Sequence, residues 1–337
     1  MKNINLFIES VIILFCVLIT ASCGNEKSQE RSKDEYSLTI DNQNGTSPDM
    51  EMQQKFLEEF QIKFGEKNIH FEKDSLGYIV ELDFNFGDSN NEVEEQLIDK
   101  INEFENLRKL HINHLELAGT DEISFDFPFL EYLYLSISGD SSRVIIKNGQ
   151  TLKNLQVFGG VVEVNSANIL KELYVSGSNI IFNNSNLSEL VSMGMVNANL
   201  KSDKGFSFKT LEKLDIGTLD KEELSVFKDI MQLKYLYIDN VNEMNTIPDF
   251  IFQNKNLEYL EVRRSELDSI SPDISNLKQL ENCDLMLNGH VKNLVEIAKL
   301  PNISIFCADD IPENRKQIEE AIEQGYNKYF SPGECMQ

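Results

Sequence analysis

Positive charge is scarce in this chain of 337 residues. It has 31 lysines and arginines against 56 aspartates and glutamates, which gives a formal net charge of −25 at pH 7. A surface this acidic repels the phosphates of nucleic acids and the headgroups of anionic lipids. We therefore expect neither nucleic acid nor an anionic membrane surface as a partner. With 41% hydrophobic residues, the chain nevertheless has enough apolar material for a substantial core.

The chain also lacks an apolar run of transmembrane length near its start. The stretch from Val11 to Ile19 is shorter than the roughly 20 residues that a spanning helix needs, and Glu9 interrupts its extension. A transmembrane anchor is the alternative that this length disfavours. Lys2 before the stretch and the small residues of Thr20-Ala21-Ser22 after it complete the three zones of a secretory signal peptide. We predict that residues 1–22 direct export.

Signatures of catalysis and of metal binding are missing as well. The sequence has no phosphate-binding glycine loop, no nucleophile elbow, no zinc-protease helix motif and no calcium-binding loop. Among only four histidines, His111 and His114 are three residues apart, so they should face opposite sides of a strand. Surface histidines explain this pair better than a metal site. We predict a protein that is not an enzyme and that uses no cofactor and no metal.

Cysteines are few, and their spacing matches neither paired zinc knuckles nor a redox Cys-x-x-Cys motif. After removal of residues 1–22, the chain keeps Cys23, Cys283, Cys307 and Cys335. The sequence leaves open whether Cys283, Cys307 or Cys335 form a disulfide.

Thr20-Ala21-Ser22-Cys23 resembles the lipobox of bacterial lipoproteins, in which the cysteine becomes the lipidated first residue. The resemblance implies that Cys23 carries acyl chains, and several chains together anchor a protein durably. Gly24 stands where the inner-membrane retention signal has aspartate, which implies the outer membrane. Residues 23–49 are polar and indicate a flexible tether. We expect an exported protein that is lipid-anchored to the bacterial cell envelope.

A six-residue pattern, L-x-x-L-x-[LIV], recurs along the chain at intervals of 17 to 28 residues. A period of this size is typical of leucine-rich repeats. Weaker copies are Ile79-Leu82-Phe84, Leu187 with Leu190, and Leu300-Ile303-Ile305. The clear copies begin at Leu107, Leu130, Leu152, Leu170, Leu211, Leu233, Leu257 and Leu280.

Over roughly residues 79 to 306 the chain therefore resembles the leucine-rich-repeat family. The resemblance implies an α/β solenoid of about eleven repeats, in which the strands form a parallel sheet on the concave side of an arc. Between Leu152 and Leu187 the repeats are too short for a helix on the outer wall. We expect a second row of strands there, through 161–164 and 180–182. Cys283 occupies a core leucine position, and alignment with Leu287 predicts that Cys307 also faces inward.

Helical spacing of apolar residues at both ends predicts caps that close the array. The predicted organisation is a signal peptide at 1–22, a tether at 23–49, an N-terminal cap with the first weak repeat at 50–105, the repeat array at 106–308, and a C-terminal cap helix and tail at 309–337.

Side chains between the core positions form exposed columns on the concave face, and six of the ten tyrosines fall in them. Tyrosine and arginine are enriched where proteins bind partners, so we predict a protein ligand at this face. A glycan-binding surface lipoprotein in nutrient capture or adhesion is the alternative, and strand preference of tyrosine would also explain the pattern. The two predicted binding clusters are Tyr132, Tyr134, Phe158 and Tyr174, and Tyr235, Tyr237, Tyr259 and Arg263.

Overall fold

The computed structural model describes residues 48–85, 95–116, 122–139 and 142–326. The chain divides into two compact units, Met1–Gly45 and Thr46–Gln337, and every described residue belongs to the second. The predicted signal peptide, most of the predicted tether and the predicted lipidation site Cys23 lie outside the described residues.

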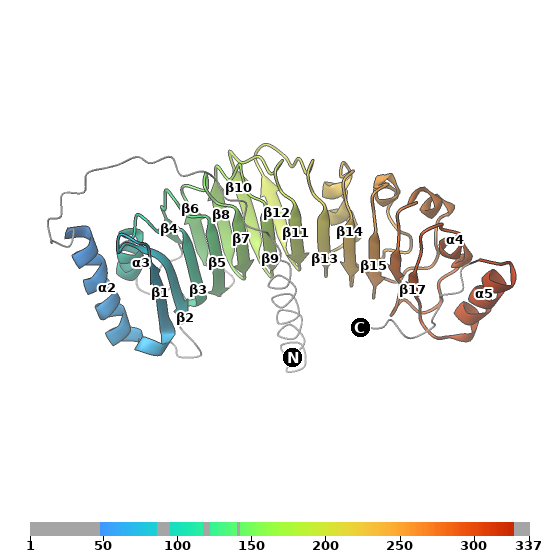
Figure 1. Cartoon of the computed structure of the whole chain (residues 1–337), viewed down its shortest axis with the longest axis horizontal. Helices are drawn as coiled ribbons and strands as arrows, with labels where there is room; N and C mark the ends of the chain where they lie inside the picture. The colour runs from blue at the N-terminus through green and yellow to red at the C-terminus, as the bar shows by residue number, and fades with distance from the viewer. Residues whose placement is uncertain (1–47, 86–94, 117–121, 140–141, 327–337) are drawn as a thin grey trace. The chain divides into compact units, whose positions relative to one another are not determined.

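Twelve strands form one sheet (Figure 1). The first strand pairs antiparallel with the second, and the other eleven run parallel in sequence order, which confirms the predicted eleven repeat strands. The antiparallel strand was not expected from the sequence. In order across the sheet the strands are β1 (Ile69–Lys73), β2 (Ile79–Asn85), β3 (Lys109–Glu116), β5 (Tyr132–Ser138), β7 (Asn154–Phe158), β9 (Glu172–Ser176), β11 (Ser192–Val196), β13 (Lys213–Gly217), β14 (Tyr235–Asp239), β15 (Tyr259–Arg263), β16 (Asn282–Asp284) and β17 (Ile305–Cys307).

A second sheet of five parallel strands forms the outer wall of the N-terminal repeats. It contains the two predicted strands and three more, because β-branched runs such as 144–146 favour extended structure even in repeats of ordinary length. Its strands are β12 (Asn199–Ser202), β10 (Asn179–Asn183), β8 (Val161–Asn165), β6 (Arg143–Ile146) and β4 (Glu122–Phe125).

Short helices replace this second sheet in the C-terminal repeats, where each unit has room for a helical turn. They are η2 (Lys221–Phe227), η3 (Asp249–Gln253), η4 (Pro272–Asn276) and α4 (Val295–Ala298).

The core lies between the two walls and repeats from strand to strand. Leu214, Leu236 and Leu260 are in register on β13, β14 and β15, and all three are fully buried. Cys283 continues this row on β16 and is also buried, as its core leucine position predicts. Each repeat thus buries the apolar edge of its neighbour, which one repeat cannot do alone.

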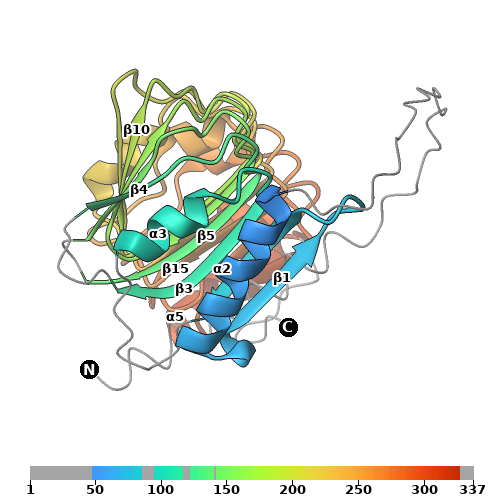
Figure 2. The same ribbon diagram turned by 90° about the vertical axis from the view of Figure 1, so that its left-hand side faces the viewer.

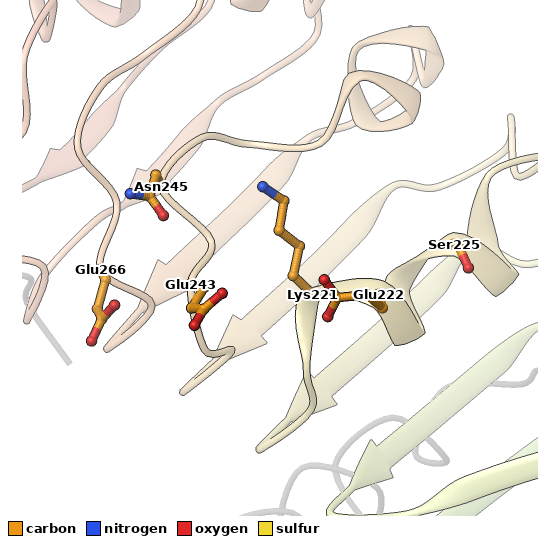
Figure 3. A pocket seen from close by; sticks show the side chains of 6 residues that line it. All are labelled: Lys221, Glu222, Ser225, Glu243, Asn245 and Glu266. Carbon is orange, nitrogen blue, oxygen red and sulfur yellow. The ribbon is translucent and has the colours of Figure 1, made fainter.

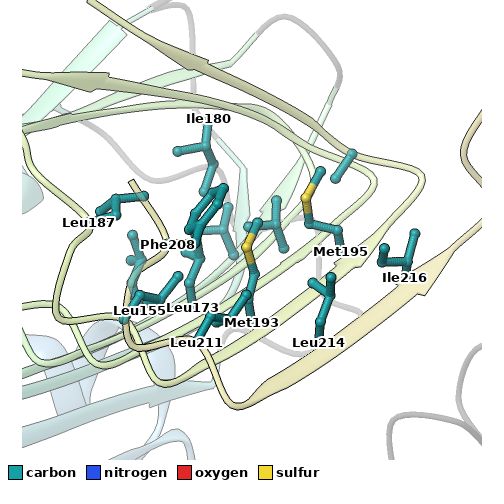
Figure 4. Close-up of a cluster of buried hydrophobic side chains, with 14 of the residues drawn as sticks. Leu155, Leu173, Ile180, Leu187, Met193, Met195, Phe208, Leu211, Leu214 and Ile216 are labelled. Atoms are coloured by element: carbon teal, nitrogen blue, oxygen red, sulfur yellow. The ribbon is translucent and has the colours of Figure 1, made fainter. Parts of the chain in front are cut away.

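The register of β11 differs from the predicted one by three residues. Met193, rather than Leu190, pairs with Leu173 and Leu214 in the core, and Met195 occupies the next inward position (Figure 4). Leu187, Leu190 and Met193 are all buried and follow one another at intervals of three residues. The pair Leu187 and Leu190 therefore fits the first two positions of the pattern as well as the pair Leu190 and Met193 does. The outward-facing positions of this strand are therefore Ser192, which is half-buried, and Gly194, which is buried.

The same shift occurs in β17. Phe306 pairs with Cys283 and is buried, whereas Ile305, predicted to face the core, is 49% exposed. Cys307 pairs with Asp284, so the predicted alignment of Cys307 with Leu287 is wrong. Leu287 is itself 52% exposed and does not face the core.

Helices close both ends of the array, as predicted (Figure 2). At the N-terminal end lie α2 (Pro48–Phe64), the short η1 (Glu66–Asn68) and α3 (Glu95–Asn102); the ring of Phe60 on α2 packs against Phe84 on β2 with 5.4 Å between centroids. At the other end, α5 (Pro312–Glu323) buries Ile318 and Ala321. None of the helices among the described residues has the length and apolar character required to cross a bilayer. The fold is a leucine-rich-repeat solenoid with helical end caps.

Candidate binding surface

Four aromatic side chains form a continuous line across β3, β5, β7 and β9. Ring centroids are 4.0 Å apart for His111 and Tyr134, 5.1 Å for Tyr134 and Phe158, and 5.4 Å for Phe158 and Tyr174. All four side chains are half-buried on the outward face of the sheet. We call His111, Tyr134, Phe158 and Tyr174 the aromatic row. Its existence requires the parallel register, which brings Tyr134 and Tyr174 to either side of Gln156.

A hollow of about 300 Å³ lies beside the N-terminal end of the aromatic row. Tyr132, a member of the first predicted cluster, lines it together with Lys109 and His111. The Lys109 ammonium lies 2.7 Å from Glu81, and this hydrogen bond raises the pKa of Lys109. Tyr132 therefore lies next to a charged hollow and not within the line of rings.

The aromatic row ends over a glycine. Gly194 on β11 is the register partner of Tyr174, and a Cβ atom at Gly194 would lie only 2.5 Å from Cδ2 of the Tyr174 ring. The ring therefore lies over Gly194 in a place that any larger residue would occupy. The sequence did not reveal this feature, because the predicted register placed Leu190 and not Met193 in the core and so left Gly194 out of the outward-facing column.

The second predicted cluster is also brought together, over β14 and β15. The rings of Tyr237 and Tyr259 are 4.8 Å apart, and the Tyr259 hydroxyl donates a hydrogen bond of 2.8 Å to Glu261. Tyr235 is 39% exposed, and its hydroxyl donates to Glu258 at 3.2 Å. These three tyrosines thus form a contiguous surface, in which carboxylates accept hydrogen bonds from the hydroxyls of Tyr235 and Tyr259.

Four carboxylates surround these tyrosines, and we call Asp215, Asp239, Glu261 and Asp284 the acidic patch. Arg263 forms an ion pair with Asp284 and lies 3.4 Å from Glu261, and Arg264 forms an ion pair with Asp239. Arg263, predicted as a binding residue, is therefore already engaged by two carboxylates. Its role within the cluster is to hold the acidic patch together.

Burial and the charges of neighbouring acids raise the pKa of two acids of this patch, Asp215 and Glu261. Burial is the main reason why the pKa of Asp215 is raised to about 6. The charges of Glu261 and Asp239 also raise this pKa, and the charge of Lys213 lowers it. Burial likewise raises the pKa of Glu261, and it raises the pKa of Tyr237 to about 12. This half of the sheet face therefore favours an added positive charge.

A second hollow, of about 620 Å³, lies at the turns that follow β13, β14 and β15 (Figure 3). Its lining is polar and holds Lys221 and three glutamates, Glu222, Glu243 and Glu266. No group of three or more histidine, cysteine, aspartate or glutamate side chains within the described ranges is arranged to hold a metal ion.

The two cysteines of the described array differ in state. Cys283 is a free, buried thiol, and burial raises its pKa. Cys307 is disulfide-bonded and buried. Neither provides an accessible thiolate, which a reactive cysteine needs.

No protein-family model matches the chain. The adenylate cyclase of Schizosaccharomyces pombe is 24% identical over 247 residues, which is 68% of this chain and 14% of that protein. The chain thus spans a small fraction of the length of the curated relative that it matches. The sequence-based prediction that the protein is not an enzyme is contradicted by this comparison, because the matched protein is an adenylate cyclase.

Solved structures with similar folds include two bacterial proteins and one plant receptor. A leucine-rich-repeat protein of Leptospira interrogans is 18% identical and covers 67% of this chain and 73% of its own, with a TM-score of 0.33. An internalin of Listeria monocytogenes is 14% identical and covers 79% and 92%, also with a TM-score of 0.33. A plant peptide hormone receptor in complex with its peptide is 11% identical and covers 70% and 57%, with a TM-score of 0.23.

Proposed function

We propose that the protein binds a protein partner through the exposed face of its twelve-stranded sheet. The observation that supports this most directly is the aromatic row, four half-buried rings in contact across four strands. Large aromatic side chains that are already held in place cost little entropy to order, and they are enriched at the centres of protein interfaces. Solenoids of stacked repeats offer extended surfaces of this kind.

A polypeptide fits this face better than a glycan does. Neighbouring rings of the aromatic row are tilted by 63°, 37° and 38°, so they form a ridge and not the flat platform on which a sugar ring stacks. The adjoining acidic patch offers carboxylate acceptors, which match the N–H groups and cationic side chains of a protein.

A photo-reactive phenylalanine analogue at Tyr235 tests the proposal in the cells that produce the protein. Tyr235 is 39% exposed on the sheet face, and the control position Phe129, 54% exposed, lies in the turn before β5. We expect illumination to cross-link one protein to the Tyr235 position and none to the Phe129 position. Equal cross-linking at both positions, or none at Tyr235, would contradict the proposal.

Removing the aromatic row should weaken binding of the cross-linked partner. For the triple variant Tyr134→Ala, Phe158→Ala and Tyr174→Ala we expect at least about 30-fold lower affinity, because three interface rings together contribute a few kcal/mol. Phe129→Ala is the matched control and should bind as the wild type does. Calorimetric titration measures the affinity, and circular dichroism verifies folding. Saturable sugar binding that disappears in the triple variant would instead favour the glycan alternative.

We further propose that the protein is exported and attached to the bacterial envelope, in the outer membrane, by lipid on Cys23. The lipobox-like Thr20-Ala21-Ser22-Cys23 supports this placement. Cys23→Ser should abolish incorporation of radiolabelled fatty acid and release the protein from the membrane fraction, because the acyl chains are the proposed attachment. Cys283→Ser controls for loss of a cysteine elsewhere. A Cys23→Ser protein that still takes up label would disprove the assignment.

A further inference from the structure

The last strand of the twelve-stranded sheet places a cysteine on the outward face and buries it completely. Cys307 on β17 pairs with Asp284 on β16, which pairs with Glu261 on β15, so the three positions form one outward-facing column. Ile305 lies two residues earlier on the same face of β17 and is 49% exposed, whereas Cys307 has no exposed surface. Because alternate residues of a strand share a face, a covering group must lie over Cys307 and not over Ile305.

Cys307 is disulfide-bonded, and its partner can be identified by elimination. Cys283, the other cysteine within the described ranges, is a free thiol. The remaining cysteines of the chain are Cys16, Cys23 and Cys335. Cys335 belongs to the same compact unit as Cys307, whereas Cys16 and Cys23 belong to the other unit. Removal of residues 1–22 and lipidation of Cys23, as proposed, would leave Cys335 alone.

The length of the chain after β17 allows this bond. The helix α5 follows Cys307, and its 12 residues measure about 18 Å from end to end. The described chain continues to Tyr326, and the nine residues from there to Cys335 span up to about 30 Å. The chain can therefore turn back past α5 and bring Cys335 to the strand from which the helix departs.

We infer that Cys307 and Cys335 form a disulfide that fastens residues 327–337 over the outward face of β17. The inference rests on the proposed export, because signal-peptide removal and lipidation exclude the other two cysteines, and it is independent of the proposed partner binding. Disulfides persist in exported proteins and are rare in the reducing cytosol. The bond forms when the two thiols transfer two electrons and two protons to the disulfide of an oxidising protein, which leaves as a dithiol.

Such a bond would serve the fold and limit the binding surface. β17 is one of the two outer strands of its sheet, and an uncovered outer strand is a template for pairing with other chains. A link from Cys307 to Cys335 also encloses α5 in a loop, which restricts the unfolded chain and stabilises the C-terminal cap. On the outward face, the fastened tail closes the position of Cys307 to a bound partner.

Peptide mapping tests the pairing. Protein from the membrane fraction is denatured in acid, alkylated without reductant and digested with trypsin, which places Cys307 in the peptide 300–315, Cys335 in 329–337 and Cys283 in 279–292. We expect mass spectrometry to detect 300–315 joined to 329–337, a species that separates on reduction, and to detect alkylated 279–292.

Three results of this mapping would overturn the inference. They are alkylation of both 300–315 and 329–337 before reduction, a link between two copies of 300–315, and a link from 300–315 to a peptide that contains Cys23. Only the third would also contradict the proposed lipid anchor. Fatty-acid labelling of Cys23 tests export and anchoring separately, so a failure of the pairing and a failure of export are distinguishable.

Labelling of the folded protein tests whether the tail covers Cys307. In Cys335→Ser the thiol of Cys307 is released at an outward position, so a maleimide should label it at least about tenfold faster than Cys283, which reacts only when the core opens locally. Cys283→Ser is the matched control and should keep the joined peptides. Circular dichroism verifies that both variants are folded. Equally slow labelling of Cys307 and Cys283 in folded Cys335→Ser would overturn the inference, because the repeats themselves and not the tail would then bury Cys307.

Discussion

Leu236→Asp should unfold the central repeats. Leu236 is fully buried, and its register partners Leu214 and Leu260 are fully buried on the strands to either side. Aspartate leaves a cavity where the leucine was and places a carboxylate among apolar side chains without a partner. We expect a loss of more than about 4 kcal/mol in the free energy of unfolding, since the cavity alone costs about 2–5 kcal/mol. Urea titration followed by circular dichroism measures it.

Tyr235→Asp is the matched control for this substitution. Position 235 is on the same strand, one residue away, and faces outward with 39% exposure. Its effect should stay below about 1 kcal/mol, as is usual for surface substitutions. Tyr237 is a poorer control, because Asp215 and Glu261 flank it in the register and would repel a third carboxylate. Similar destabilisation by Leu236→Asp and Tyr235→Asp would show that the assignment of inward and outward faces is wrong.

The repeat period predicted the number of parallel strands because each repeat buries the same positions. The register failed only in β11 and β17, where apolar residues recur every three positions through Leu187, Leu190 and Met193, and through Leu300, Ile303 and Phe306. In such a run the pattern L-x-x-L fits two registers equally well. Only the pairing of neighbouring strands decides between them.

The extra strand β1 could not be predicted from the repeat, because it pairs antiparallel with β2 and contains no copy of the pattern. The five strands of the outer wall were predicted only in part for a related reason. Short repeats leave too few residues for a helix, so a strand can be predicted there from length. β4 and β6 lie in longer repeats, of 23 and 22 residues between Leu107, Leu130 and Leu152, where length does not exclude a helix. There the local preference of β-branched residues for strands decides the structure.

The binding clusters were predictable to the extent that they depend on alternation along a strand. Tyr134 and Tyr174, or Tyr237 and Tyr259, face outward because they lie between core positions. Contacts that depend on three-dimensional geometry were not predictable. Three contacts require the register and the side-chain directions: the position of Phe158 between two tyrosines, the ion pair of Arg263 with Asp284, and the Tyr174 ring over Gly194.

Asp215→Asn should stabilise the protein at neutral pH and not in acid. The pKa of Asp215 is about 6 in the folded protein against an ordinary value of 3.8, so the folded state holds this proton more tightly than the unfolded state does. For an acid with a pKa raised in this way, the free energy of unfolding falls as pH rises from about 4 to about 6. Above that range the acid is ionised in both states, and the loss of stability stays constant. Burial is the main cause; Glu261 and Asp239 add to it, and Lys213 opposes it.

Asparagine has no charge to desolvate and therefore avoids this cost. A shift from 3.8 to about 6 corresponds to up to about 3 kcal/mol, and partial solvent contact of Asp215 reduces the expected gain to about 1–3 kcal/mol. Urea unfolding of wild type and variant at pH 4, 5, 6 and 7 should give curves that coincide at pH 4 and separate above pH 5. Glu222→Gln, at an exposed position, should follow the wild type throughout. A constant difference across the pH range, or a less stable variant at pH 7, would show that a partner already compensates the Asp215 charge. The expected separation would instead identify a carboxylate that destabilises the fold at neutral pH, as is common where a binding site holds charge ready for its ligand.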